Sequence, residues 1–66
     1  MTVFLNGDRR DLAEPIAISG LLTSLGVDPR MVAVELNRVV VKRVQYPDTV
    51  IRDGDDVEIV AFVGGG

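Results

Sequence analysis

The 66-residue sequence contains neither cysteine nor histidine, and its only lysine is Lys42. Without cysteine the chain forms no disulfide and offers no thiolate to a metal. The same absences remove the usual general base of enzymes and their strongest side-chain nucleophile. No glycine-rich phosphate loop is present, because the last three glycines precede no helix. We therefore expect no bound cofactor, no metal site, and a protein on which enzymes act rather than an enzyme.

Basic residues and long apolar runs are also scarce. Seven basic residues stand against ten acidic ones, which gives a net charge of −3 and a pI of about 4.6. This balance argues against nucleic-acid binding, which needs basic surface, and favours a partner with a basic face. No apolar run approaches the length of a membrane span, and no signal peptide is recognisable at the start. We expect a cytoplasmic protein that is monomeric when free and binds no membrane.

The first half of the chain predicts a hairpin followed by a helix. Residues 2–6 alternate as a strand, Asn6-Gly7 is a strong hairpin-turn signal, and residues 9–12 form the return strand. A helix of about two turns follows, with Gly26 at its C-terminal cap and either Ala17 or Ser19 at its start. Its predicted core stripe consists of Ile18, Leu21, Leu22 and Leu25.

The second half predicts more strands and turns. Residues 31–36 alternate as a strand, Asn37-Arg38 reads as a turn, and the valines at 39–41 predict a strand that is buried on both faces. Pro47 excludes a central strand in the segment 42–52, where Tyr46 is expected to cover one edge of the core. The acidic segment 53–56 is interpreted as a turn rather than a calcium loop, because further spaced oxygen ligands are missing.

The final strand is predicted over residues 57–63. One face carries Val57, Ile59, Ala61 and Val63, and the other carries Glu58, Val60 and Phe62. The second face is polar at first and becomes apolar toward the end of the strand. Val60 and Phe62 are therefore candidates for a partner interface, since exposed apolar patches often mark interaction sites. The alternative, that another segment of the chain covers them, remains open at this point.

The order of elements predicts an α+β fold in which one helix packs on a small mixed sheet. It is compatible with a β-grasp, in which the first and last strands pair centrally. We assign residues 1–63 to this domain and residues 64–66 to a flexible glycine tail. Glycine adopts backbone conformations closed to other residues, so this tail can thread into the narrow active site of an enzyme.

The carboxylate of Gly66 is the remaining candidate for chemistry. An α-carboxyl group titrates near pH 3.5 and is therefore an anion at neutral pH, which resists nucleophiles. Transfer of AMP from ATP would create a better leaving group, and a sulfur nucleophile would then give a thiocarboxylate. Because the chain has no cysteine, any sulfur that it carries has to sit on the main chain.

The chain resembles the sulfur-carrier proteins of thiamine biosynthesis, which are ubiquitin-like β-grasp proteins. The resemblance covers essentially the whole chain, and no single segment carries it alone. The matching segments are residues 2–7, Leu21-Leu22 with Leu25-Gly26, residues 32–37, residues 53–59 and the terminal residues 63–66.

The resemblance implies a function for the tail. An adenylyltransferase related to ubiquitin-activating enzymes would use ATP to adenylate Gly66, and Gly64 and Gly65 would thread the tail into its active site. A persulfide donor such as a cysteine desulfurase would supply sulfur. Thiazole synthase would then take the sulfur from the thiocarboxylate.

Three alternatives remain open from the sequence. The first is a sister sulfur carrier, such as the small subunit of molybdopterin synthase or a carrier for tRNA thiolation or cysteine synthesis. The second is a ubiquitin-like protein modifier or binding module. The third is a structural domain whose glycine tail is incidental.

Overall fold

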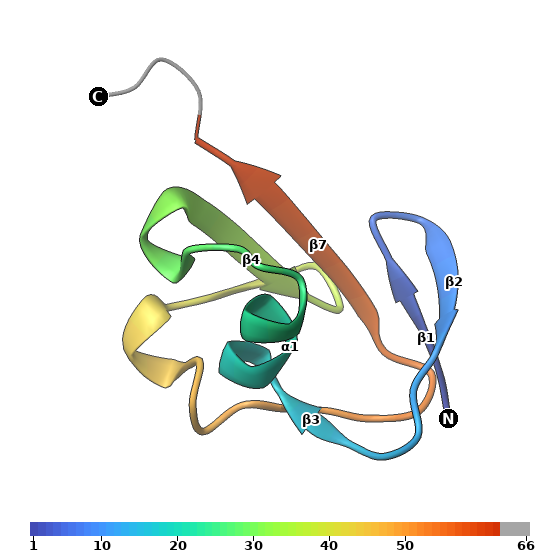
Figure 1. Ribbon diagram of the computed structural model, residues 1–66. Coiled ribbons are helices and arrows are strands. Elements are labelled where there is room, and N and C mark those ends of the chain that lie inside the picture. The colour runs from blue at the N-terminus through green and yellow to red at the C-terminus, as the bar shows by residue number, and fades with distance from the viewer. Residues whose placement is uncertain (63–66) are drawn as a thin grey trace.

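The computed structural model describes residues 1–62, in which a single α-helix lies across one face of a twisted sheet (Figure 1). The five-stranded sheet has the order β2-β1-β7-β4-β5, and a two-stranded sheet pairs β3 with β6. β1 is parallel to β7, and the other neighbours are antiparallel. The elements are β1 (Thr2–Leu5), β2 (Asp8–Asp11), β3 (Ile16–Ala17), α1 (Ile18–Ser24), the 3-10 helix η1 (Pro29–Met31), β4 (Val32–Leu36), β5 (Val39–Val41), the 3-10 helix η2 (Arg43–Gln45), β6 (Val50–Ile51) and β7 (Asp56–Ala61).

This arrangement confirms the predicted β-grasp, with the first and last strands paired at the centre of the sheet. The parallel pairing of β1 with β7 requires a long connection, and the helix lies within that connection. The boundary predicted after residue 63 and the predicted tail at 64–66 lie outside the described residues. Within residues 1–62, no helix is long and apolar enough to cross a membrane.

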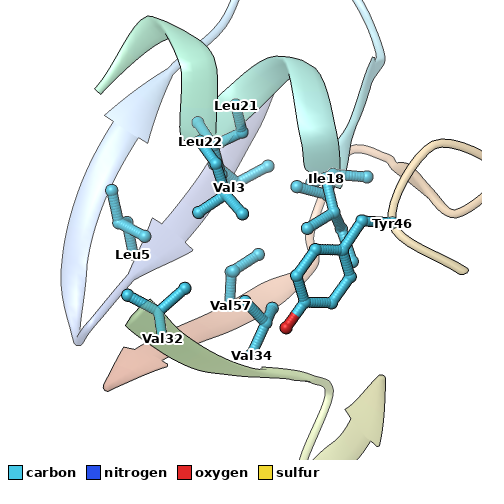
Figure 2. Packing of buried hydrophobic residues seen from close by; sticks show 10 residues of the cluster. Val3, Leu5, Ile18, Leu21, Leu22, Val32, Val34, Tyr46 and Val57 are labelled. Carbon is cyan, nitrogen blue, oxygen red and sulfur yellow. The ribbon is translucent and has the colours of Figure 1, made fainter. Parts of the chain in front are cut away.

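The core lies between α1 and the sheet. Figure 2 shows helix residues Leu21 and Leu22 above strand residues Val3 and Val57, with Ile18 beside the ring of Tyr46. No buried polar or charged residue occurs among residues 1–62, so the core is held by aliphatic packing and by this one aromatic ring. The buried residues are Val3, Leu5, Ile18, Leu21, Leu22, Val32, Val34, Tyr46, Ile51 and Val57.

The helix begins after Ala17, whose side chain makes no capping hydrogen bond. Of the two predicted starts, Ala17 is therefore the one observed, and Ser19 lies inside the helix. Gly20 is also inside the helix, where glycine is intrinsically unfavourable. A Cβ at this position would lie 3.0 Å from Cγ1 of Ile16, so the close passage of β3 favours glycine.

The helix ends in the predicted glycine cap. Gly26 has a φ of +70°, and its N–H donates to the carbonyl of Thr23 at 3.0 Å, while the N–H of Val27 donates to the carbonyl of Leu22 at 2.9 Å. This pair of bonds is a Schellman motif. Leu25, predicted to be in the core, is instead the C-cap residue and is exposed, because the chain leaves the helical path at this point.

The prediction that the valines at 39–41 are buried on both faces is wrong. Within residues 1–62, β5 pairs only with β4 and forms an edge of the sheet. Val39 is 66% exposed and Val40 is 68% exposed, whereas Val41 is half-buried. A short apolar run cannot reveal how many neighbours its strand has, since that number depends on the strand order.

The segment around Pro47 contains no central strand, as predicted. It forms η2 and then β6, which pairs with β3 at one end of the molecule. Tyr46 is more deeply placed than predicted, because it is only 3% exposed and belongs to the core itself. β3 and β6 were not predicted, since two-residue strands are too short to show an alternating pattern.

Candidate functional site

The candidate site is built on β7, the central strand that leads to the glycine tail. β7 pairs with β4 from Leu36↔Val57 to Val32↔Ala61 and with β1 at Leu5↔Val57. Val57 is completely buried at the start of the strand, whereas Val60 and Ala61 are exposed at its end. The strand is therefore anchored in the core at one end and reaches the surface at the other.

Asn6 attaches β7 to the first hairpin. Its backbone N–H donates to the carbonyl of Val57 at 2.9 Å. Its side-chain amide donates to the carbonyl of Ile59 at 3.1 Å and accepts the N–H of Ile59 at 2.7 Å. The side chain thus continues the β1–β7 pairing after the backbone of Asn6 has turned away with a φ of +50°. The sequence predicted a turn at Asn6-Gly7 correctly but gave no indication of this second role.

Asn37 makes a similar attachment at the start of β7, on the side of β4. Its backbone N–H donates to the carbonyl of Asp56 at 2.7 Å, and its side-chain oxygen accepts the N–H of Asp56 at 2.9 Å. Its side-chain NH₂ also donates to Asp55 at 3.0 Å. Asn37 has a φ of +52°, which confirms the predicted turn. Two asparagines with left-handed backbone therefore hold β7 from both sides.

The acidic turn before β7 makes hydrogen bonds to the backbone of the protein itself. Gly54 has a φ of +86°, as the predicted turn requires. The carboxylate of Asp53 accepts the N–H of Thr2 at 2.7 Å, and that of Asp55 accepts the N–H of Arg52 at 2.8 Å. Within residues 1–62, no group of three His, Cys, Asp or Glu residues could hold a metal ion.

Phe62 lies at the end of the described chain. The sequence left open whether another segment covers Phe62 and Val60. The N–H of Phe62 donates to the carbonyl of Met31 at 2.9 Å, which extends the β4–β7 pairing by one further bond. Its side chain is 60% exposed, and that of Val60 is 56% exposed. No other segment among residues 1–62 covers them. The candidate tail residues Gly64, Gly65 and Gly66 lie outside the described residues.

An apolar surface lies beside Phe62. Ala33, Val40 and Val60 are on the face of the sheet opposite the helix, because they alternate with residues that face the core. Val60 lies directly across from Ala33, and Val40 lies on the neighbouring strand. We call Ala33, Val40, Val60 and Phe62 the outer patch. Ala33, Val40 and Phe62 also line a hollow of about 280 Å³, together with Pro29, Arg30, Val32, Val41, Arg43 and Tyr46.

Acidic side chains border the outer patch along β7 and β4. Glu58 lies directly across from Glu35, and both are half-buried. Like charges placed opposite each other on a sheet repel, so this pair weakens the isolated domain. A cationic group of a partner would relieve that repulsion. Ala33 and Val60, with the two carboxylates next to them, therefore suit a partner surface that is apolar and basic, whereas the charges beside Val40 on β5 are positive.

Arg30, at the rim of the hollow, is bound to Asp28. Its Nη2 lies 2.8 Å from Oδ2 of Asp28, and its backbone N–H donates to Oδ1 at 2.9 Å. These hydrogen bonds from Arg30 lower the pKa of Asp28 from 3.8 to about 2. They also raise the pKa of Arg30 above its ordinary value.

The lowered pKa of Asp28 predicts a pH dependence. Because the folded protein holds the charged form, this pair stabilises the fold above pH 3.8, and its contribution is lost as the pH falls toward 2. We expect an NMR titration of the Asp28 carboxyl carbon to give a midpoint near 2, and Arg30→Gln to move that midpoint back toward 3.8. An unchanged midpoint in the variant would contradict the assigned cause.

The model of the ThiS family matches residues 3–66. The sulfur carrier protein ThiS of Thermus thermophilus is 42% identical over 64 residues, which cover 97% of this chain and 98% of that protein. The chain belongs to the ThiS family. The predicted resemblance to the sulfur carriers of thiamine biosynthesis is thereby confirmed.

Structural comparison agrees with membership of the ThiS family. The crystal structure of the thiamine biosynthesis protein ThiS from Geobacter metallireducens superposes with a TM-score of 0.87 and 38% identity, and each chain is covered completely. A second kind of relative is longer. The thiazole synthase of Paramagnetospirillum magneticum is 44% identical over 66 residues, and this chain spans only 20% of its length.

Proposed function

We propose that this ThiS-family protein carries sulfur as a thiocarboxylate on Gly66 and donates it to thiazole synthase. The observation that carries the proposal is the match of the family model through residue 66, since it includes the glycine whose carboxyl group would be modified. An adenylyltransferase would transfer AMP from ATP to the Gly66 carboxylate and release pyrophosphate. The sulfur of a persulfide, for example from a cysteine desulfurase, would then displace AMP, and reduction of the resulting acyl disulfide by a thiol would leave the thiocarboxylate.

The described residues suit a carrier better than a catalyst. The sequence has no cysteine or histidine to act as nucleophile or general base. Instead the fold supplies a rigid base for the tail, because Asn6 and Asn37 fix β7 on both sides. The protein would therefore act as a substrate of its partner enzymes and bind no cofactor of its own.

The longer relatives support thiazole synthase as the acceptor. In the two thiazole synthases, from Paramagnetospirillum magneticum and Magnetococcus marinus, the segment similar to this chain makes up 20% of the protein. A carrier and its acceptor joined in one chain meet at a high effective concentration. Delivery of sulfur to thiazole synthase is the function most consistent with that arrangement. We keep the cytoplasm as the expected location.

The test is the intact mass of the protein after incubation with ATP, the adenylyltransferase and a persulfide donor. We expect one oxygen atom to be replaced by sulfur, and fragmentation to place the sulfur on Gly66. Omission of ATP serves as the control and should leave the mass unchanged. Sulfur on any other residue would overturn the proposal. So would an unchanged mass after incubation with an adenylyltransferase that does modify another ThiS-family protein under the same conditions.

The outer patch is proposed as the surface that the adenylyltransferase contacts. Replacement of Phe62 by Asp puts a charge on this apolar surface next to the tail, so we expect at least a tenfold loss of affinity for the enzyme. Thermal stability should change little, because the side chain is 60% exposed in the folded protein. Binding can be measured by isothermal titration calorimetry and stability by circular dichroism.

Val44→Asp is the matched control, because Val44 lies on η2 outside the outer patch and is 79% exposed. It introduces the same charge and should leave the affinity unchanged. Equal losses in both variants would point to a general charge effect rather than to the outer patch. A collapse of the fold in the Phe62 variant would show that this residue belongs to the core.

A further inference from the structure

The two edges of the main sheet differ in character. β2 forms one edge and reads Asp-Arg-Arg-Asp, so charged side chains protect it against pairing with another chain. β5 forms the other edge and consists of three valines, two of which are about two-thirds exposed. An exposed apolar edge strand is a template for a further strand. The fold thus protects one edge with charge at every position and leaves valines along the other.

The backbone of β5 presents hydrogen-bonding groups at this edge. The two-residue turn Asn37-Arg38 makes Leu36 and Val39 the first hydrogen-bonded pair of the hairpin. Alternation along an antiparallel ladder then turns the N–H and C=O of Val40 away from β4. The carbonyl of Lys42 accepts the N–H of Gln45 at 2.8 Å, so the strand ends there. Val40 is therefore the residue that an added strand would pair with.

Positive charge flanks these valines. Arg38, Lys42 and Arg43 are all exposed, and no acidic residue occurs between positions 36 and 47. Glu35 lies directly across from Val40, but on β4, the side away from the open edge. The ion pairs of residues 1–62 lie elsewhere, at Arg9–Asp11 and Arg30–Asp28. The segment 38–43, which we call the basic edge, thus carries local positive charge on a chain whose net charge is −3.

We propose that the basic edge binds an extended acidic segment of a partner protein, which adds to the sheet as a sixth strand beside β5. Backbone bonds to Val40 would give affinity, and carboxylates of the partner would pair with Arg38 and Lys42. A second copy of the chain is a poor occupant. Two antiparallel copies of β5 centred on Val40 would place Arg38 of each copy near Lys42 of the other, and like charges across a sheet repel.

The basic edge is continuous with the candidate site. Val40 belongs to both surfaces, and Arg43 lines the hollow beside Phe62. A strand laid along β5 would therefore reach the base of the glycine tail and hold a partner close to it. The proposal does not depend on the sulfur chemistry of Gly66, so each can fail without the other.

The test uses the ¹⁵N-labelled full-length chain and two short blocked peptides of alternating valine and threonine, one with glutamate at both ends and one with lysine. We expect the glutamate peptide to shift the amide signals of Val40 and Lys42, and the lysine peptide to bind at least fivefold more weakly. Equal binding of both peptides, or shifts centred on β2, would overturn the proposal. Concentration-dependent dimerisation through β5, detected by sedimentation, would also overturn it.

Two variants sharpen the test. Val40→Pro removes the outward N–H without breaking a hydrogen bond to β4, and proline is tolerated on an edge strand. The fold should therefore persist while affinity for the glutamate peptide falls about fivefold. Arg38→Glu combined with Lys42→Glu should reverse the preference toward the lysine peptide. The control Arg9→Glu with Arg10→Glu reverses two charges on β2 and should leave the preference unchanged. Unaltered preference in the β5 charge variant would contradict the assignment.

Discussion

Removal of Gly66 is expected to abolish thiocarboxylate formation completely. The reacting atom would be the carboxyl carbon of this residue, and its loss shortens the tail by about 3.3 Å, the span of one extended residue. In the shortened chain the carboxylate of Gly65 would stop that distance short of the α-phosphorus of ATP, which it has to attack. Misplacement of reacting groups by about 1 Å already costs roughly a hundredfold in rate, so the shorter tail should give no product within the assay.

The matched comparison is a short tag placed at either end. A tag after Gly66 turns its carboxylate into an amide and should also abolish the reaction. The same tag before Met1 should be tolerated, because an amide N–H in place of the terminal ammonium can still donate to the carbonyl of Leu12, now bound at 2.9 Å. Circular dichroism should show an intact fold in all three variants. Product from the shortened or C-terminally tagged chain would show that the carboxylate of Gly66 is not the site.

Leu22→Ala is expected to destabilise the fold by about 2–5 kcal/mol, the range for truncation of a buried leucine. Leu22 is 1% exposed and lies between the helix and the sheet, as Figure 2 shows. A chain of 66 residues has a total stability of roughly 3–10 kcal/mol, and this one has no disulfide to support it. The variant should therefore be largely unfolded in moderate urea, where the natural protein remains folded.

Leu25→Ala provides the control for this substitution. It makes the same chemical change one residue beyond the same helix, at a side chain that is 37% exposed. We expect it to cost less than about 1 kcal/mol, because less apolar surface is lost and the site opens to solvent. Urea unfolding followed by circular dichroism measures both. Equal losses of stability would contradict the packing described for α1.

The comparison of sequence and structure shows which signals are local. Asn6-Gly7, Asn37-Arg38 and Gly26 were all predicted as turns or caps, and each adopts the positive φ that its role requires. Positive φ selects glycine and asparagine because of clashes within a few atoms of the residue itself. Arg38 is the exception, with a φ of +69° as the second residue of its two-residue turn. Such positions are therefore visible in a sequence without knowledge of the fold.

The predictions about exposure were less successful, for a physical reason. Val39 and Val40 were expected to be buried and lie at an open edge, whereas Leu25 was expected in the core and is exposed. The paired amide of Asn6, which holds Ile59, also escaped prediction because the two residues are 53 positions apart. Each of these facts depends on which segments become neighbours in space.

The sequence by itself determined the four-residue and longer strands, the helix and its cap, the lack of cysteine and histidine, and the choice of Gly66 as the candidate residue. Backbone geometry and residue chemistry depend on neighbouring residues, so short segments of the sequence are enough to predict them. Only the tertiary structure decided that β7 is central, that Val60 and Phe62 are exposed, and that β5 is an open basic edge. Strand order and burial result from contacts between distant segments, which no single stretch of sequence contains.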